Sequence, residues 1–174
     1  MSSIEDILAR ARPVERVVPV CLRGDLLAEW DSLEHQLATV GESGDEGSLG
    51  TLSPSKRIAL RMAELREEMA SETVDFRLRG MSPQALSDLQ AEHPARQGRE
   101  AKEAWNPETF SVALVAACAV DPEMTVEQTQ ALFVTLNRSQ RNDLFNGAWE
   151  ASTGSVSIPF SERASEILRN TAAK

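Results

Sequence analysis

The feature that most constrains the fold of this chain is the apolar run from Phe110 to Val120, in which Ser111 is the only polar residue. The run is too short to span a bilayer, which needs about 20 apolar residues, so we expect it to be buried inside the protein. Asn106-Pro107 ahead of it suits a helix N-cap followed by proline, and Asp121-Pro122 behind it ends a helix. A helix that is apolar on nearly every face must be covered on nearly every face. We therefore predict a buried central helix and expect Ala117→Asp to unfold the C-terminal half.

Composition and charge exclude several classes of protein. Of the 174 residues, 41% are hydrophobic, which is enough to bury a core. The net charge of −9 argues against nonspecific binding to nucleic acid. Cys21 and Cys118 lie far apart without the spacing of a metal site, which indicates a reducing compartment. The N-terminal stretch lacks the apolar core of a secretory signal, so we expect a cytoplasmic protein without a membrane or nucleic-acid partner.

Residues 1–15 predict an N-terminal arm helix. Ser2 or Ser3 can cap a helix that begins at Ile4 and ends at about Arg12, before Pro13. Four apolar residues share one face of this helix: Ile4, Ile7, Leu8 and Ala11. The arm is either docked on the rest of the protein or mobile, and the sequence leaves both open.

Residues 16–80 predict a strand, two helices and a second strand. Arg16–Leu22 is rich in β-branched residues, with Pro19 placing it at a sheet edge, and Thr73–Arg79 alternates apolar and charged residues. Between them, two helices carry apolar residues with the 4–3 spacing of a coiled-coil seam, namely Leu26, Trp30, Leu33, Leu37 and Val40, then Ile58, Met62, Leu65 and Met69. Because two such helices return the chain to its start, we predict a two-stranded antiparallel ribbon that carries a helical hairpin.

Several features of this unit allow both a functional and a structural interpretation. Arg23-Gly24-Asp25 is an adhesion tripeptide in secreted proteins, but we favour a tight turn in which Asp25 caps a helix. The charges between Arg57 and Glu68 form either a partner face or an ordinary solvated face, and we favour the second. Gly41–Leu52 has no apolar period and reads as a flexible tether between the helices.

Residues 81–174 predict a C-terminal helical bundle around the apolar run. Helix starts are indicated at Ser82-Pro83, at a capping box that begins with Thr125, and at Asn137 or Ser139. Ser155–Phe160 alternates like a strap or an edge strand, and Ser161–Thr171 predicts a last amphipathic helix. We therefore expect a mainly α protein, with the β-α-α-β unit followed by this bundle.

A search for chemistry finds no catalytic, cofactor or metal signature. The phosphate-binding, dinucleotide, nucleophile-elbow, zinc-protease and calcium-loop motifs are all missing from the sequence. His35 and His93 have no cluster of ligand residues beside them, and Asp121 and Glu123 flank Pro122 in what reads as a turn. We predict a binding or assembly protein that is not an enzyme and takes no cofactor.

Three large aromatic residues near predicted helix ends are candidates for partner binding. They are Trp105, Phe145 and Trp149, in a chain with only 5% aromatic residues. The alternative, which we favour on burial statistics, is that they pack as core against the Phe110–Val120 helix.

Two stretches carry a recognisable pattern. Residues 92–152 contain an EHPA element, a polar loop, an NPETF helix start, the AACAVDP run, a TVEQ helix start and an LFNGA helix, and residues 18–40 read VPVCLRGDLLAEWDSLEHQLATV. Together they resemble tail assembly chaperones of siphophages that infect actinobacteria, whose genes lie just before the tape measure gene. Ala95 departs from that pattern, in which a second proline stands here.

The resemblance implies a mostly helical, non-enzymatic protein that coats the tape measure protein and delivers it to tail tube subunits in the host cytoplasm. Such proteins are often made in two forms through a programmed frameshift, and self-association is possible. The alternatives that stay open are a structural virion component, such as a tail or connector subunit, and a small enzyme with a cryptic site.

Overall fold

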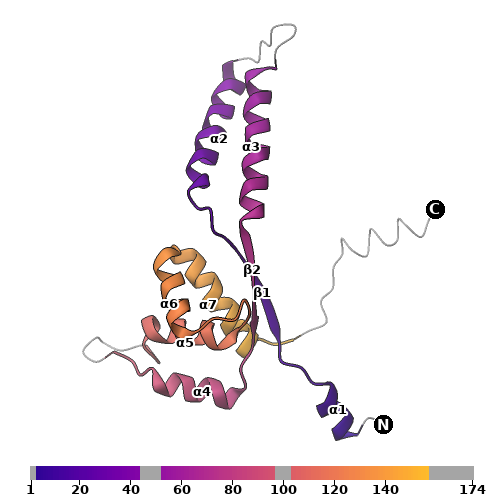
Figure 1. The fold of residues 1–174 in the computed structure, drawn as a ribbon, viewed down its shortest axis with the longest axis vertical. Coiled ribbons are helices and arrows are strands. Elements are labelled where there is room, and N and C mark those ends of the chain that lie inside the picture. The colour runs from indigo at the N-terminus through magenta and orange to yellow at the C-terminus, as the bar shows by residue number, and fades with distance from the viewer. Residues whose placement is uncertain (1–2, 44–51, 97–102, 157–174) are drawn as a thin grey trace, which may run out of the picture.

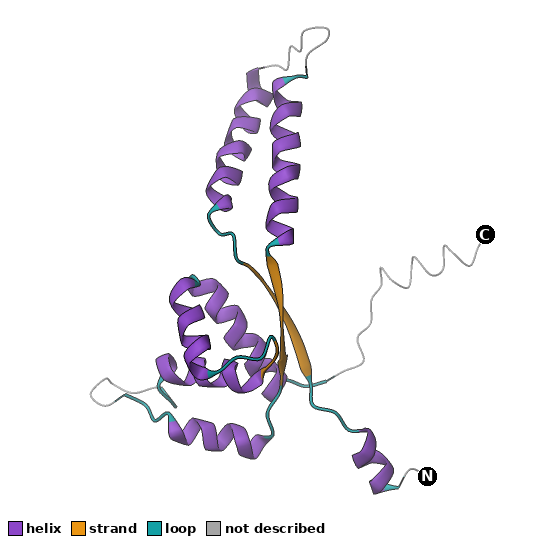
Figure 2. Ribbon diagram, in the orientation of Figure 1, coloured by secondary structure: helices purple, strands orange, loops and turns teal. Residues whose placement is uncertain are grey.

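The computed structural model describes residues 3–43, 52–96 and 103–156 as a mainly helical protein with a small antiparallel sheet (Figures 1 and 2). In chain order its elements are α1 (Ile4–Arg10), β1 (Glu15–Cys21), α2 (Leu26–Ser43), α3 (Pro54–Ser71), β2 (Thr73–Arg79), α4 (Pro83–Glu92), α5 (Pro107–Cys118), β3 (Ala119–Asp121), α6 (Val126–Thr135) and α7 (Arg138–Thr153). Of the expected tether, Gly41–Leu52, residues 41–43 belong to α2 and residues 44–51 lie outside the described residues. The expected strap, Ser155–Phe160, lies outside them from residue 157 on, and so does the whole expected last helix, Ser161–Thr171.

The sheet has three strands, so the prediction of a two-stranded ribbon is wrong. β1 and β2 pair antiparallel with Val18 opposite Phe76, and β3 adds to the other edge of β2, with Leu78 opposite Ala119. β3 uses the end of the apolar run, because α5 ends at Cys118 and the backbone of Ala119 is extended. A short apolar segment can form either a helix or a buried strand. Residues 119–121 form a strand because the edge of β2 offers them hydrogen-bond partners, which the local sequence does not reveal.

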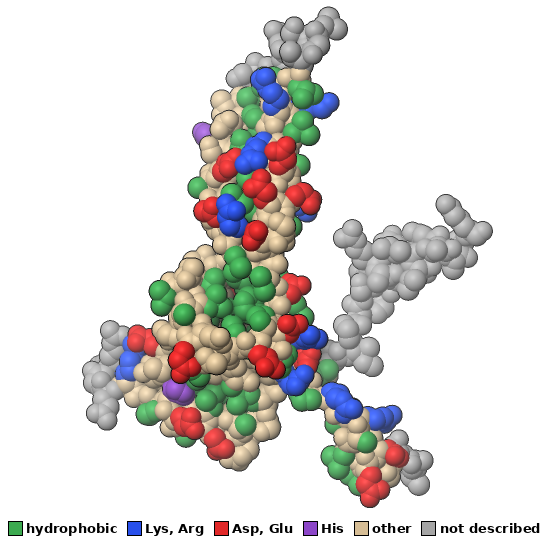
Figure 3. All heavy atoms as spheres, viewed as in Figure 1, with side chains coloured by type: hydrophobic (Ala, Val, Ile, Leu, Met, Phe, Trp, Pro, Cys, Tyr) green, Lys and Arg blue, Asp and Glu red, His purple; other side chains and the backbone are tan. Residues whose placement is uncertain are grey.

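Helices α2 and α3 lie side by side and project from one end of the sheet (Figure 1). Leu26 and Leu65 are buried between them near the sheet, whereas the other seam residues are half-buried. Arg61 of α3 binds three carboxylates, those of Glu29 on α2 (2.8 Å) and of Glu64 and Glu68 on its own helix (3.2 Å each). Only the Arg61–Glu29 pair links the two helices, and the other two pairs lie within α3. Figure 3 shows charges of both signs along the hairpin.

The main core lies where α5 meets α4, α6, α7 and the sheet. Phe110, Leu114, Val115 and Cys118 of α5 have no solvent exposure. Ala117, however, is exposed, so the apolar run within α5 is covered on nearly every face except at this position, and the expectation that Ala117→Asp unfolds the C-terminal half loses its basis. The elements packed on α5 leave one side chain of its last turn open to water, and a charge at that position would stay hydrated.

The N-terminal arm is a short helix whose side chains are all exposed. Ser3 and Asp6 form a reciprocal capping box at its start. In the turn between β1 and α2, Arg23 and Asp25 bind each other through two hydrogen bonds of 2.8 Å, which accords with a structural turn.

Candidate partner-binding groove

Local capping fixes where α5, α6 and α7 begin. Asn106, Thr125 and Asn137 each accept a hydrogen bond from a backbone N–H of the first turn, as their positions in the sequence predict. Asn106 also donates its backbone N–H to the carbonyl of His93 at the end of α4 (2.9 Å). This bond holds the preceding residue, Trp105, beside the helices.

The structure brings Trp105, Phe145 and Trp149 together around Phe110, which is fully buried. The ring centroid of Trp105 lies 4.9 Å from that of Phe110 and 5.2 Å from that of Trp149, and Phe145 stacks on Trp149 at 6.1 Å. All three predicted residues are only half-buried. They therefore cover the core and also face the surface, and their role in partner binding stays a prediction.

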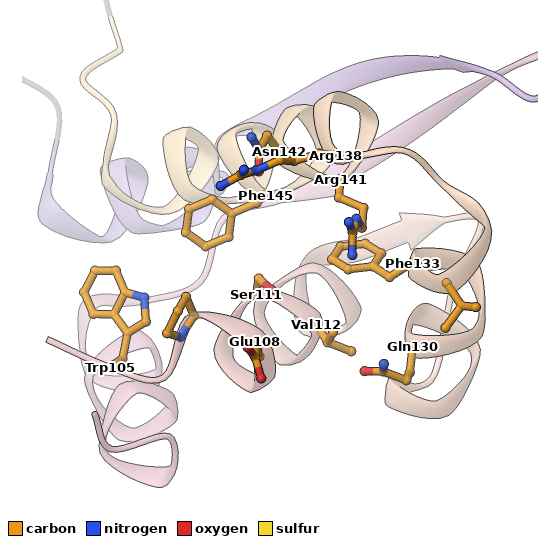
Figure 4. Close-up of a pocket in the computed structure, with 12 residues that line it drawn as sticks. Trp105, Glu108, Ser111, Val112, Gln130, Phe133, Arg138, Arg141, Asn142 and Phe145 are labelled. Carbon is orange, nitrogen blue, oxygen red and sulfur yellow. The ribbon is translucent and has the colours of Figure 1, made fainter. Parts of the chain in front are cut away.

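An open groove of about 730 Å³ runs between α5, α6 and α7 (Figure 4). Trp105 and Phe145 lie toward one end, Phe133 and Gln130 toward the other, and Ser111 and Val112 of α5 lie between them. The lining residues come from the start of α5 and from facing turns of α6 and α7, namely Trp105, Pro107, Glu108, Ser111, Val112, Gln130, Phe133, Val134, Arg138, Arg141, Asn142 and Phe145. Trp149 is not among them, but its ring packs against those of Trp105 and Phe145, which are.

The groove exposes apolar surface at its rim. Val134 of α6 is 79% exposed, the highest value among the large hydrophobic residues that are exposed in the described chain. Figure 3 shows hydrophobic side chains gathered on the face of the helical part below the hairpin. Sequence reasoning missed Phe133 and Val134, because α6 alone does not reveal which of its apolar residues the neighbouring helices leave uncovered.

Arg138 and Arg141 give one wall of the groove a positive charge. They are the only basic residues between 103 and 156, a stretch that contains seven acidic residues. No carboxylate of the described residues lies within ion-pair distance of either guanidinium. The opposite wall carries Glu108, which is bound by Arg96 at 2.9 Å and remains largely exposed. Sequence reasoning did not select these two arginines as site residues, although an isolated basic pair in an acidic stretch is visible in the sequence alone.

Neither the histidines nor the cysteines of the described chain line the groove. Among the residues that the structure describes, no three His, Cys, Asp or Glu side chains cluster as metal ligands would. His93 shares a hydrogen bond of 2.9 Å with Thr109, and His35 is exposed on the hairpin. Burial raises the pKa of the Cys118 thiol, which disfavours the reactive thiolate. None of the described helices combines the length and apolar character that crossing a membrane requires.

Comparison with protein-family models, with curated proteins and with solved structures finds no match to this chain. The shape and charge of the groove are therefore the basis for the function proposed next.

Proposed function

We propose that this protein is a siphophage tail assembly chaperone, which binds the tape measure protein in the cytoplasm of the infected host and aids assembly of the tail tube. It acts by binding and is not an enzyme. The observation that carries this proposal is the open groove between α5, α6 and α7, with aromatic and aliphatic side chains inside and Arg138 and Arg141 on one wall. The resemblance of residues 92–152 to such chaperones covers all three helices that form the groove.

A groove of this kind suits a long helical partner. An amphipathic helix places its apolar face in a hydrophobic groove and keeps its polar face in water. Arginine side chains without an ion pair in the described chain can bind carboxylates that border the apolar face of such a helix. The net charge of −9 would help to keep the complex soluble, because a long and partly apolar partner would otherwise favour aggregation.

We assign different partners to different parts of the chain. The C-terminal bundle, residues 81–174, would bind the tape measure protein, and the strand–hairpin–strand unit, residues 16–80, would meet the tail tube protein. β1 supports the second assignment because it is an edge strand, with Val17 exposed, and an edge strand can pair with a strand of another protein.

The proposal is tested by co-expressing the tagged chain with overlapping segments of the tape measure protein encoded beside it. The wild type should retain at least one helical segment. Val134→Asp and the double variant Arg138→Glu/Arg141→Glu should lose it, because both change exposed groove residues without touching the core. Leu60→Asp is the control, because Leu60 is also exposed (48%) but lies on α3 outside the groove, and this variant should bind normally. Failure of the wild type to retain any segment would refute the proposal.

A second candidate function is that of a structural tail or connector subunit of the virion. The projecting hairpin favours it, and so does the edge of β1, which pairs with no further strand of the described chain, because both could join neighbouring subunits (Figure 1). Protein analysis of purified particles separates the two functions. A subunit is present in stoichiometric amount, whereas a chaperone is missing from the mature particle.

A further inference from the structure

Helix α1 exposes an apolar stripe that no other residue described by the structure covers. Ile4, Ile7 and Leu8 are 65%, 47% and 67% exposed, and α1 has no buried residue. They share one face of the helix because they stand three and four positions apart. A helix of seven residues has little stability in water without packing, so its exposed stripe points to a partner surface.

The tether between α1 and the sheet is short. The backbone N–H of Gly80 donates to the carbonyl of Val14 (2.8 Å), which fixes Val14 at the end of the sheet. Only residues 11–13 then separate the helix from this fixed point, so Arg10 can lie at most about 14 Å from Val14 at full extension. In Figure 1, α1 lies away from α5 and α6, which form two of the groove walls. This arrangement favours a partner surface on another molecule over one on the same chain.

We infer that α1 of one copy docks in the α5–α6–α7 groove of a second copy, so that two chains exchange their N-terminal arms. Ile4, Ile7 and Leu8 would enter the groove beside Phe133, Val134 and Phe145. Because each chain offers one arm and one groove, a mutual exchange closes into a symmetric dimer. The docked arm and the helical partner proposed above would occupy the same groove in turn, so the dimer is expected for the chain without that partner.

The charges beside the stripe match those of the groove walls. At about 100° per residue, Glu5 borders the apolar stripe on one side and Arg10 borders it on the other. The groove has Arg138 and Arg141 on one wall and Glu108 on the opposite wall. An arm with Glu5 toward the arginines therefore places Arg10 toward Glu108, and this pairing selects one direction for the docked helix.

Sedimentation velocity of the full chain over a range of concentrations tests the exchange. The wild type should form a dimer. Ile7→Ser/Leu8→Ser in the arm and Val134→Asp in the groove should each raise the dimer dissociation constant about tenfold or more, because each removes or blocks apolar contact. Leu60→Ser on α3 is the matched control and should dimerise like the wild type. A wild type that is monomeric at all concentrations, or a dimer that persists in both variants, would overturn the inference.

A charge exchange tests the proposed direction of the arm. Glu5→Lys and Arg138→Glu/Arg141→Glu should each weaken the dimer, and combining all three changes in one chain should restore most of the lost affinity. Circular dichroism of each variant checks that the fold is kept. The triple variant tests the contact directly, because restored affinity requires that Glu5 and the arginines meet in the dimer. If the three changes weaken the dimer additively, Glu5 does not contact the arginines and the proposed pairing is overturned.

Discussion

Gly147 of α7 lies directly against the side chain of Val18 in β1. A Cβ atom added to Gly147 would overlap the Val18 Cγ2 atom and would lie 3.2 Å from the Leu78 Cδ1 atom of β2. The absence of a side chain at this one position therefore lets α7 approach β1 and β2 closely. The groove depends on this contact, because α7 carries Arg138, Arg141 and Phe145.

Gly147→Ala is expected to lower the free energy of unfolding by about 1–3 kcal/mol, the usual cost of overpacking a core. The overlap should outweigh the roughly 1 kcal/mol that alanine gains over glycine within a helix. Gly24→Ala is the control, because no atom lies within 4 Å of a Cβ added there. Urea unfolding measures both variants, and a Gly147→Ala protein as stable as the wild type would show that α7 and β1 are not packed this closely.

Ala117→Asp is expected to remain folded, whereas Leu114→Asp, one turn earlier on α5, should not. Ala117 is exposed, so the new carboxylate stays hydrated. Leu114 has no solvent exposure, and an unpaired charge there would be buried in the core. Circular dichroism and thermal melts of the two variants measure the contrast. Unfolding of the Ala117→Asp variant would mean that this face of α5 is covered.

The Arg61–Glu29 ion pair is expected to make hairpin stability depend on pH. The hydrogen bond from Arg61 lowers the pKa of Glu29 below its usual value of 4.5. Because the pKa of Glu29 is lower in the folded state than in the unfolded state, the ion pair stabilises the fold at every pH above the unfolded-state pKa. This stabilisation is lost as the pH falls through the folded-state pKa. Arg61→Gln should therefore speed amide hydrogen exchange in α2 at pH 7, with a smaller difference from the wild type at pH 3.

Arg57→Gln is the matched control for that measurement, since the side chain of Arg57 forms no ion pair with the residues that the structure describes. Added salt should reduce the effect of Arg61→Gln at pH 7, because exposed charges are screened. An effect of equal size at pH 3 and pH 7 would show that Arg61 acts through packing of its aliphatic stem.

Cys118 is expected to resist alkylation in the folded protein at pH 8, while Cys21 reacts faster. Cys118 is fully buried, and burial raises the pKa of its thiol, which leaves less of the nucleophilic thiolate. Cys21 is only partly buried. Iodoacetamide labelling followed by peptide mass analysis distinguishes the two sites. Equal labelling rates without denaturant would mean that the α5 core opens readily.

Local sequence signals were enough to place most helix and strand ends. Asn106, Thr125 and Asn137 begin helices because a cap is made by side chains within a few positions of the backbone groups that they satisfy. The alternation in Thr73–Arg79 gave the bounds of β2 for a similar reason, since period-two burial is visible in a single strand.

Long-range contacts set the features that local patterns left undefined. Ala119–Asp121 becomes a strand because β2, more than 40 positions earlier, offers an open edge. Ala117 faces water because of how α4, α6 and α7 pack around α5. The groove likewise exists only where three helices meet, so Arg138 and Arg141 join Trp105 and Phe145 at one site through packing. The amino-acid order specified the elements and their caps, while the position of each free edge and open face came from contacts between residues far apart in the chain.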